Sequence, residues 1–118
     1  HSVGNHAILR ALATVKQPPK LLGAIFVAGW WTVDQVWPSL APWTRHDEDL
    51  ARARALLPSL TVLIADNDRL TSDYQSNALE WKRRMDCTVQ IVKGAGHFNG
   101  PEQPAVLAAL ESVIAKNK

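Results

Sequence analysis

The chain has 118 residues, a formal net charge of +2, 47% hydrophobic residues and 20% charged residues. These values predict a single small globular domain and exclude a disordered chain. The lysines and arginines are scattered along the sequence, which argues against a nucleic-acid partner. The longest apolar run, residues 21–31, has about half of the ~20 residues that a membrane span needs, so we expect no such span.

Cys87 is the only cysteine in the sequence. It has no partner for an internal disulfide, and such sparing use of cysteine fits a reducing compartment. We therefore expect a cytoplasmic location.

The first part of the chain predicts a helix, a strand and a loop. Residues 5–15 predict a helix, which the prolines within residues 16–20 end. The apolar residues on one face of this helix are Ile8, Leu9, Leu12 and Val15. Residues 21–29 are almost all apolar, which is typical of a strand buried on both faces of a parallel sheet. The tryptophan-rich segment 30–45 contains prolines and predicts a loop with short helical turns.

The middle of the chain predicts a helix followed by two more strands. Residues 46–57 carry acidic residues in the first turn and arginines later, an order that suits the helix dipole. Glu48 and Arg52 are spaced for an ion pair four residues apart. Residues 60–66 predict a second buried strand, and residues 87–92 predict a third strand.

Two further helices complete the pattern. Ser72 and Gln75 form a capping-box pattern that opens one helix. The expected core face of that helix is Tyr74, Ala78, Trp81 and Met85. Residues 104–115 predict the last helix, whose expected apolar face is Val106, Leu107, Leu110, Val113 and Ile114. Because helices and strands alternate, the fold class is α/β, with a three-stranded parallel sheet inside a three-layer α/β/α arrangement.

Four candidate side chains fall at one edge of this expected sheet. In open α/β sheets, functional groups gather in loops beyond the carboxyl ends of the strands. Asp66 and Asp68 follow the second predicted strand, and His97 lies between glycines after the third. Ser2 stands directly before the first predicted helix and would reach the same edge if a strand preceded it.

The order Ser2, Asp68, His97 is that of the α/β-hydrolase triad, whose serine sits on a G-x-S-x-G turn. A serine hydroxyl is a poor nucleophile until a histidine takes its proton, and an aspartate orients the imidazole. The Val3 amide would be one donor of the oxyanion hole. We also expect Gly4 to be required, because a side chain there would collide with neighbouring backbone.

Each of these residues also has a structural explanation. HSVG matches only part of the G-x-S-x-G pattern, and His-Ser at the start of a chain is also a common remnant of a purification tag. Asp68 in a polar turn can act as a cap, and a histidine between glycines can be structural. The three explanations are nearly independent, so the common edge and the order of the residues favour the hydrolase.

Three blocks of the sequence, HSVGNHAILRAL, LIADNDRLTS and VKGAGHFNG, resemble the small α/β-hydrolase-fold serine hydrolases of the YdeN / retinoblastoma-binding protein nine family. The resemblance runs from Ser2 to the final helix. It implies that Ser2 is the nucleophile, His97 the general base and Asp68 the orienting acid. Asp66 stays open as the alternative acid, because the two prolines that usually follow the aspartate in this family are missing here.

The resemblance also implies a missing segment. Family members carry a strand leading into the elbow and a loop that gives the second oxyanion donor, and neither precedes Ser2 here. The first glycine of the elbow is missing as well. We expect residues 1–118 to be the C-terminal part of a single α/β-hydrolase domain, either truncated just before the nucleophile or paired with a separate N-terminal segment of the same protein.

The expected function is therefore a serine hydrolase that cleaves carboxylic esters or related small acyl compounds through an acyl-enzyme, without a cofactor. His1 and His6 are poorly spaced for metal ligands on one helix, so we expect no metal site. Four tryptophans could line an acyl pocket or serve only in packing, namely Trp30, Trp31, Trp37 and Trp43. The alternatives are a non-catalytic protein-interaction module and an inactive fragment. A Leu-x-Cys-x-Glu docking motif is absent, because Cys87 lies in the sequence MDCTV.

Overall fold

A computed structural model describes residues 1–46 and 48–117 of the chain. Three parallel strands form one sheet, with β2 in its centre: β1 (Ala24–Val27), β2 (Leu60–Ala65) and β3 (Thr88–Val92). In the register of the sheet, Ala24 pairs with Leu60 and Thr61 pairs with Thr88. The predicted parallel sheet is confirmed, although each strand is shorter than the range predicted for it.

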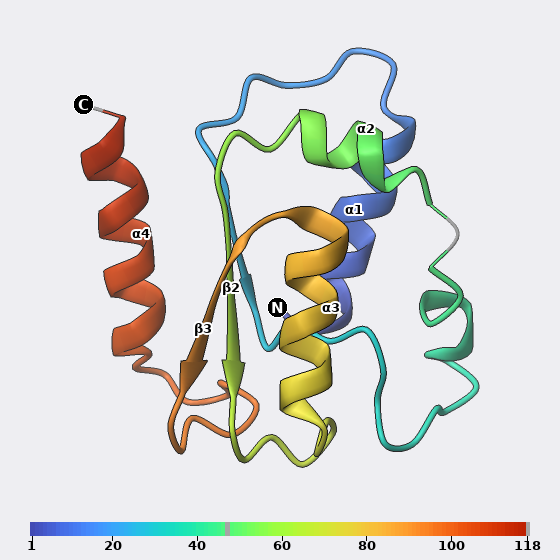
Figure 1. The fold of residues 1–118 in the computed structure, drawn as a ribbon, viewed down its shortest axis with the longest axis vertical. Helices are drawn as coiled ribbons and strands as arrows, with labels where there is room; N and C mark the ends of the chain where they lie inside the picture. The colour runs from blue at the N-terminus through green and yellow to red at the C-terminus, as the bar shows by residue number, and fades with distance from the viewer. Residues whose placement is uncertain (47, 118) are drawn as a thin grey trace.

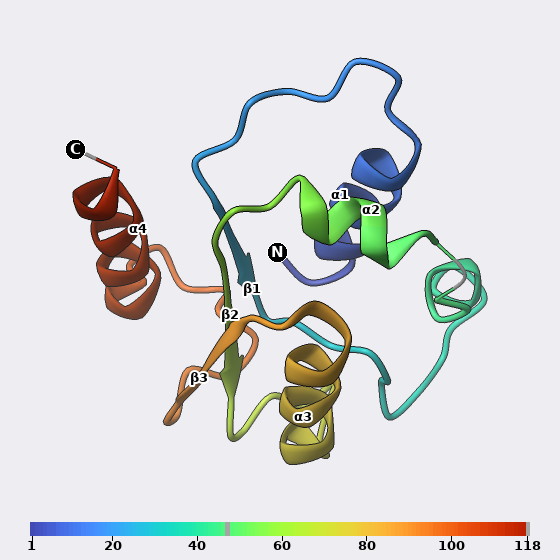
Figure 2. The ribbon, with the colours of Figure 1, turned by 45° about the horizontal axis from the view of Figure 1, so that its top comes forward.

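Helices cover both faces of the sheet. They are α1 (Val3–Thr14), α2 (Leu50–Ala55), α3 (Tyr74–Met85) and α4 (Pro104–Lys116), with a short 3-10 helix η1 (Ala41–Trp43). Figures 1 and 2 show α4 on one side of the sheet and the other three α-helices on the opposite side. The predicted three-layer α/β/α arrangement is therefore confirmed. No helix within the described ranges combines the length and the apolar character required to cross a lipid bilayer.

The central strand β2 is buried on both faces because its side chains alternate between two hydrophobic clusters. Val62 and Ile64 face a cluster made with α1, α2 and α3, which includes Leu9 and Trp81. Side chains from the other face of the sheet and from α4 form the second cluster, whose buried members are Ala28, Leu63, Ala65, Phe98 and Ala109.

The buried face of α1 differs from the predicted one. Ile8 is 43% exposed, whereas the polar residues Asn5 and His6 are fully buried beside Leu9 and Leu12. Both polar side chains bond to backbone carbonyls: Asn5 Nδ2 donates to Val27 O at 3.0 Å, and His6 Nε2 donates to Trp30 O at 2.6 Å. These bonds rotate α1 so that Ile8 points away from the core.

The helix predicted over residues 46–57 is only the six-residue α2. Asp49 caps its N-terminus by accepting a bond from the Arg52 amide at 3.1 Å. Glu48 precedes the helix, and the predicted pair between Glu48 and Arg52 is not formed. The Arg52 guanidinium instead donates to the carbonyls of Leu12 and Val15, which ties α2 to the end of α1.

The predicted capping box of α3 is also wrong by one residue. Asp73 is the cap, and its side chain accepts a bond from the Ser76 amide at 3.1 Å. Ser72 is used elsewhere, because its amide and its hydroxyl both donate to Asp34. The chain before α3 is thereby joined to the loop that follows β1.

On α4 only part of the predicted apolar face is buried. Ala109 and Val113 contact the sheet side of the helix, with 5% and 9% of their surface exposed. Three further apolar residues of the predicted face are about half exposed, namely Leu107, Leu110 and Ile114. The helix is the only element of its layer within the described residues, so no second helix shields these side chains.

Replacement of Trp81 by alanine is expected to lower the free energy of unfolding by about 3–5 kcal/mol. The side chain is fully buried, and its ring lies 4.5 Å from that of Trp31 and 5.6 Å from that of Phe26. Urea unfolding measures the loss. Trp37 is 42% exposed, and Trp37→Ala should cost no more than about 0.5 kcal/mol. Equal losses for the two variants would contradict this account of the core.

Candidate active site

Ser2 lies at the carboxyl end of β1, although it comes first in the chain. Its amide donates to the carbonyl of Val27, the last residue of β1, at 2.8 Å. Ser2 has φ 55° and ψ −125°, a backbone conformation that costs about 1–3 kcal/mol for a residue with a side chain. A strained turn directly before a helix is the structural context expected of an α/β-hydrolase nucleophile.

Asp68 and His97 are in direct contact. His97 Nδ1 lies 2.7 Å from Asp68 Oδ2, although 29 residues separate them in sequence. Asp68 is 5% exposed, and its other oxygen accepts the Leu70 amide at 2.9 Å. A neutral imidazole that donates through Nδ1 to a carboxylate has its lone pair on Nε2. The pair is therefore arranged as an oriented base.

Asp66 does not contact His97 but holds the backbone of the His97 loop. Asp66 Oδ1 accepts the Gly94 amide at 2.9 Å, and Asn67 Oδ1 accepts the Gly96 amide at 2.8 Å. Gly94 and Gly96 have φ of 74° and 59°, which glycine adopts without strain. Of the two aspartates left open by the sequence, Asp68 is the one beside the imidazole.

The hydroxyl of Ser2 faces Trp30 in this structure. Trp30 Nε1 donates to Ser2 Oγ at 3.3 Å, and no hydrogen bond joins Ser2 to His97. The residue before Ser2 contacts the His97 loop. His1 Nε2 donates to the carbonyl of His97 at 2.7 Å, and the centres of the two imidazole rings lie 4.8 Å apart. Ser2 and His97 are thus on adjacent segments but are not yet paired.

Trp30 is a site residue that the sequence did not single out from the other tryptophans. Only 1% of its surface is exposed, and its carbonyl accepts the bond from His6 Nε2. Burial lowers the pKa of His6 to about 4, so this imidazole is neutral at pH 7. The chain of bonds from His6 through Trp30 to Ser2 fixes the indole beside the serine.

The surroundings of Val3 and Gly4 differ from expectation in one respect. Val3 is the first residue of α1, so its N–H has no partner within the helix and can serve as an oxyanion donor. The prediction for Gly4 is wrong here, because a Cβ at this position would meet no described atom within 4 Å. The space beside the first turn of α1 is open, and the expected collision with backbone does not occur.

The other tryptophans after β1 serve mainly in packing. Trp31 is 1% exposed within the core, whereas Trp43 stacks on the Arg10 guanidinium at 4.3 Å. The segment is held by Asn77, a buried residue whose role the sequence did not suggest. Asn77 Oδ1 accepts the amides of Trp31 and Thr32 at 2.5 and 3.0 Å. A lone asparagine on the apolar face of a predicted helix was the available signal.

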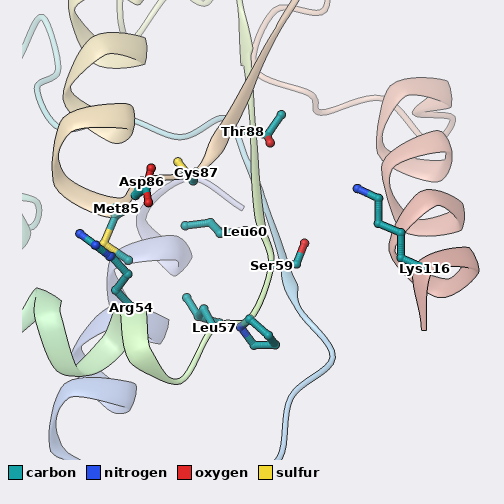
Figure 3. A pocket seen from close by; sticks show the side chains of 10 residues that line it. Arg54, Leu57, Ser59, Leu60, Met85, Asp86, Cys87, Thr88 and Lys116 are labelled. Atoms are coloured by element: carbon teal, nitrogen blue, oxygen red, sulfur yellow. The ribbon is translucent and has the colours of Figure 1, made fainter.

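Two cavities bear on the location of the site. One, of about 490 Å³, lies beside the oriented base and is lined by Asn67, Asp68, Arg69, Leu70, Gly96, His97 and Asn99. A second, of about 650 Å³, lies at the opposite edge of the sheet, where β2 and β3 begin; Figure 3 shows Cys87 and Arg54 among its lining residues. Burial raises the pKa of the Cys87 thiol to about 11, so this cavity offers no cysteine thiolate at neutral pH.

Comparisons with known proteins identify a family and a fold. A family model described as serine hydrolase matches residues 1–113. The solved structure of the ydeN gene product from B. subtilis matches with a TM-score of 0.79 and 24% sequence identity. The match covers 98% of this chain and 63% of that one, so the chain spans less than two thirds of the length of that protein. The likeness shows the α/β-hydrolase fold, and no curated protein matched the chain.

Proposed function

The chain belongs to the serine hydrolase family, and from this premise we propose that it cleaves carboxylic esters or related small acyl compounds with Ser2, His97 and Asp68. The observation that carries the proposal is the 2.7 Å contact between His97 Nδ1 and Asp68 Oδ2 beside the strained turn of Ser2. A carboxylate that fixes one imidazole nitrogen prepares the other to act as a general base.

In the proposed reaction, His97 Nε2 takes the proton of Ser2 as Oγ attacks the substrate carbonyl carbon. The tetrahedral intermediate collapses, the bond to the leaving group breaks, and His97 returns the proton to that group. Water then attacks the acyl-enzyme with the same histidine as base, which releases the acid and restores Ser2. Asp68 stabilises the imidazolium that forms in both steps.

The resting contact between Trp30 and Ser2 sets a requirement for this reaction. Ser2 Oγ must turn from Trp30 Nε1 toward His97 Nε2 before its proton can be taken. The indole N–H can only donate a hydrogen bond. It therefore bonds to Ser2 Oγ as an acceptor and cannot take the serine proton. We propose that substrate binding or a neighbouring segment favours the turned position.

The oxyanion hole supports a further proposal about the extent of the domain. The Val3 N–H would supply one donor, and a second would come from a segment outside residues 1–118. We propose that these residues are the C-terminal part of one α/β-hydrolase domain, and that a preceding segment pairs with β1. Two observations support this: β1 pairs with β2 along one edge only within the described residues, and Ile8 on nearby α1 is 43% exposed.

A fluorophosphonate probe tests the proposed nucleophile. We expect one probe per chain, attached to Ser2 and abolished by prior heat denaturation, because only the folded site activates the hydroxyl. Intact-mass and peptide mass spectrometry read out the number and the position of the adducts. Adducts on serines other than Ser2 would refute the assignment.

The second candidate is a non-catalytic interaction module or inactive fragment, which the bond between Trp30 and Ser2 Oγ favours. The same labelling, repeated with a preceding segment supplied on the same chain, separates the candidates. Labelling that needs this segment supports the proposal that the segment supplies the second donor of the oxyanion hole. Absence of labelling in both forms would leave a binding module with hydrolase architecture.

A further inference from the structure

Three potential metal ligands meet away from Ser2 and the oriented base. His6 lies on α1, and His46 and Glu48 belong to the segment before α2. One ligand atom from each side chain lies within 4.8 Å of the other two. His6 is 40 positions from His46 in sequence, so the fold brings it to the two ligands before α2.

Backbone carbonyls bond to Nε2 of both imidazoles, which leaves Nδ1 of each ring to bind a metal. His6 Nε2 donates to Trp30 O at 2.6 Å, and His46 Nε2 donates to Trp31 O at 2.5 Å. A neutral ring that donates through Nε2 has its lone pair on Nδ1. Both Nδ1 atoms are buried and have no hydrogen-bond partner among residues 1–46 and 48–117. Backbone carbonyls commonly orient metal-binding histidines through their second nitrogen in this way.

The carboxylate of Glu48 lacks a compensating charge in the described part of the chain. Both of its oxygens are buried, and neither has a hydrogen-bond partner there. The nearby Arg10 guanidinium is engaged elsewhere, since it stacks on the Trp43 ring and donates to Pro42 O. Burying an ionised carboxylate without a partner is costly, and a bound cation would remove that cost.

We propose that His6, His46 and Glu48 bind one Zn²⁺ ion. Two imidazole nitrogens and a carboxylate oxygen form a donor set that zinc uses, whereas Mg²⁺ and Ca²⁺ prefer oxygen ligands alone. A tetrahedral zinc ion with bonds of about 2.0–2.1 Å holds its ligands about 3.3 Å apart, so binding would draw the three atoms together. The fourth ligand would be water.

The proposed ion would fasten the long segment after β1 to the first helix. Only α1 and this segment contribute ligands, and the carbonyls that orient the histidines belong to Trp30 and Trp31. The site is therefore structural and separate from the proposed hydrolysis, which needs no metal. Zinc would nevertheless steady Trp30, whose indole contacts Ser2.

Zinc titration of the metal-stripped chain, without a histidine tag, tests the site. We expect one ion per chain, a higher melting temperature with zinc, and tetrahedral absorption bands when Co²⁺ replaces it. His46→Ala and Glu48→Gln should weaken zinc binding by about 100-fold or more, because outer-shell changes alone cost 10–100-fold. His97→Ala and Glu111→Gln remove the same groups outside the cluster and should bind like the wild type.

Glu48→Gln adds a test that does not depend on affinity. Without metal, the variant should melt at or above the temperature of the wild type, because it loses an uncompensated buried charge. With saturating zinc it should melt below the wild type. A wild-type chain that binds no stoichiometric zinc, or binding that both site variants leave unchanged, would overturn the proposal.

Discussion

Replacement of Ser2 by alanine is expected to reduce turnover of an activated acyl ester by about 10⁶-fold, to the level of the uncatalysed reaction plus any effect of binding. The hydroxyl is the proposed nucleophile, and it lies on the strained turn directly before α1. His97→Ala should cost about as much, since an unactivated serine reacts poorly. The double variant should be no worse than either single variant, because the residues act as a unit.

Steady-state kinetics in the form of the protein that reacts with the fluorophosphonate probe measure these losses. Ser112→Ala on the exposed face of α4 is the matched control and should keep full activity. Additive losses in the double variant would contradict a shared step, and a Ser2→Ala variant with comparable turnover would end the proposal for Ser2.

Asp68→Asn is expected to lower kcat by about 10⁴-fold while the fold persists. An asparagine amide can donate to His97 Nδ1, which leaves the proton on Nε2 and removes the lone pair that must accept the serine proton. Asp68 contacts His97 at 2.7 Å, whereas Asp66 contacts the Gly94 amide. Asp66→Asn retains an oxygen that can accept that amide, so we expect only a small change in kcat.

The comparison of the two asparagine variants decides which aspartate orients the base. Circular dichroism and urea unfolding check that both variants are folded, and kcat is then compared at pH values above and below neutrality. A larger loss in Asp66→Asn than in Asp68→Asn would reverse the assignment.

The layers of the fold were predictable because strong local patterns specify them. The apolar runs around residues 24–27 and 60–65 predict buried strands, and both are found in the sheet. Exact bounds were less predictable, since the cap of α3 depends on which side chain the tertiary structure leaves available. Ser72 is bonded to Asp34, which comes from a distant loop, and Asp73 is left to cap the helix.

Buried polar residues account for the error in the buried face of α1. Asn5, His6 and Asn77 belong to core faces only because backbone carbonyls or amides from the end of β1 and the segment after it meet their side chains. Periodicity in apolar residues cannot reveal such partners, and it assigned Ile8 to the core in their place.

The candidate site was predictable in part. The order and loop positions of Ser2, Asp68 and His97 came from sequence, and the structure places the last two in contact. Their catalytic roles stay predictions. Trp30 and the cluster of His6 with Glu48 were missed because their contacts join segments that no local motif connects.

The backbone is strained at both of the sites proposed above. Among residues 1–46 and 48–117, five residues other than glycine have left-handed φ values: Ser2, Ala28, His46, Asp86 and Phe98. Each such conformation costs about 1–3 kcal/mol, which glycine would avoid. Ser2 lies at the candidate active site and His46 in the proposed zinc site. Glycine at either position would relieve this strain but would remove the proposed nucleophile or the proposed ligand, so backbone strain and proposed function are linked at both positions.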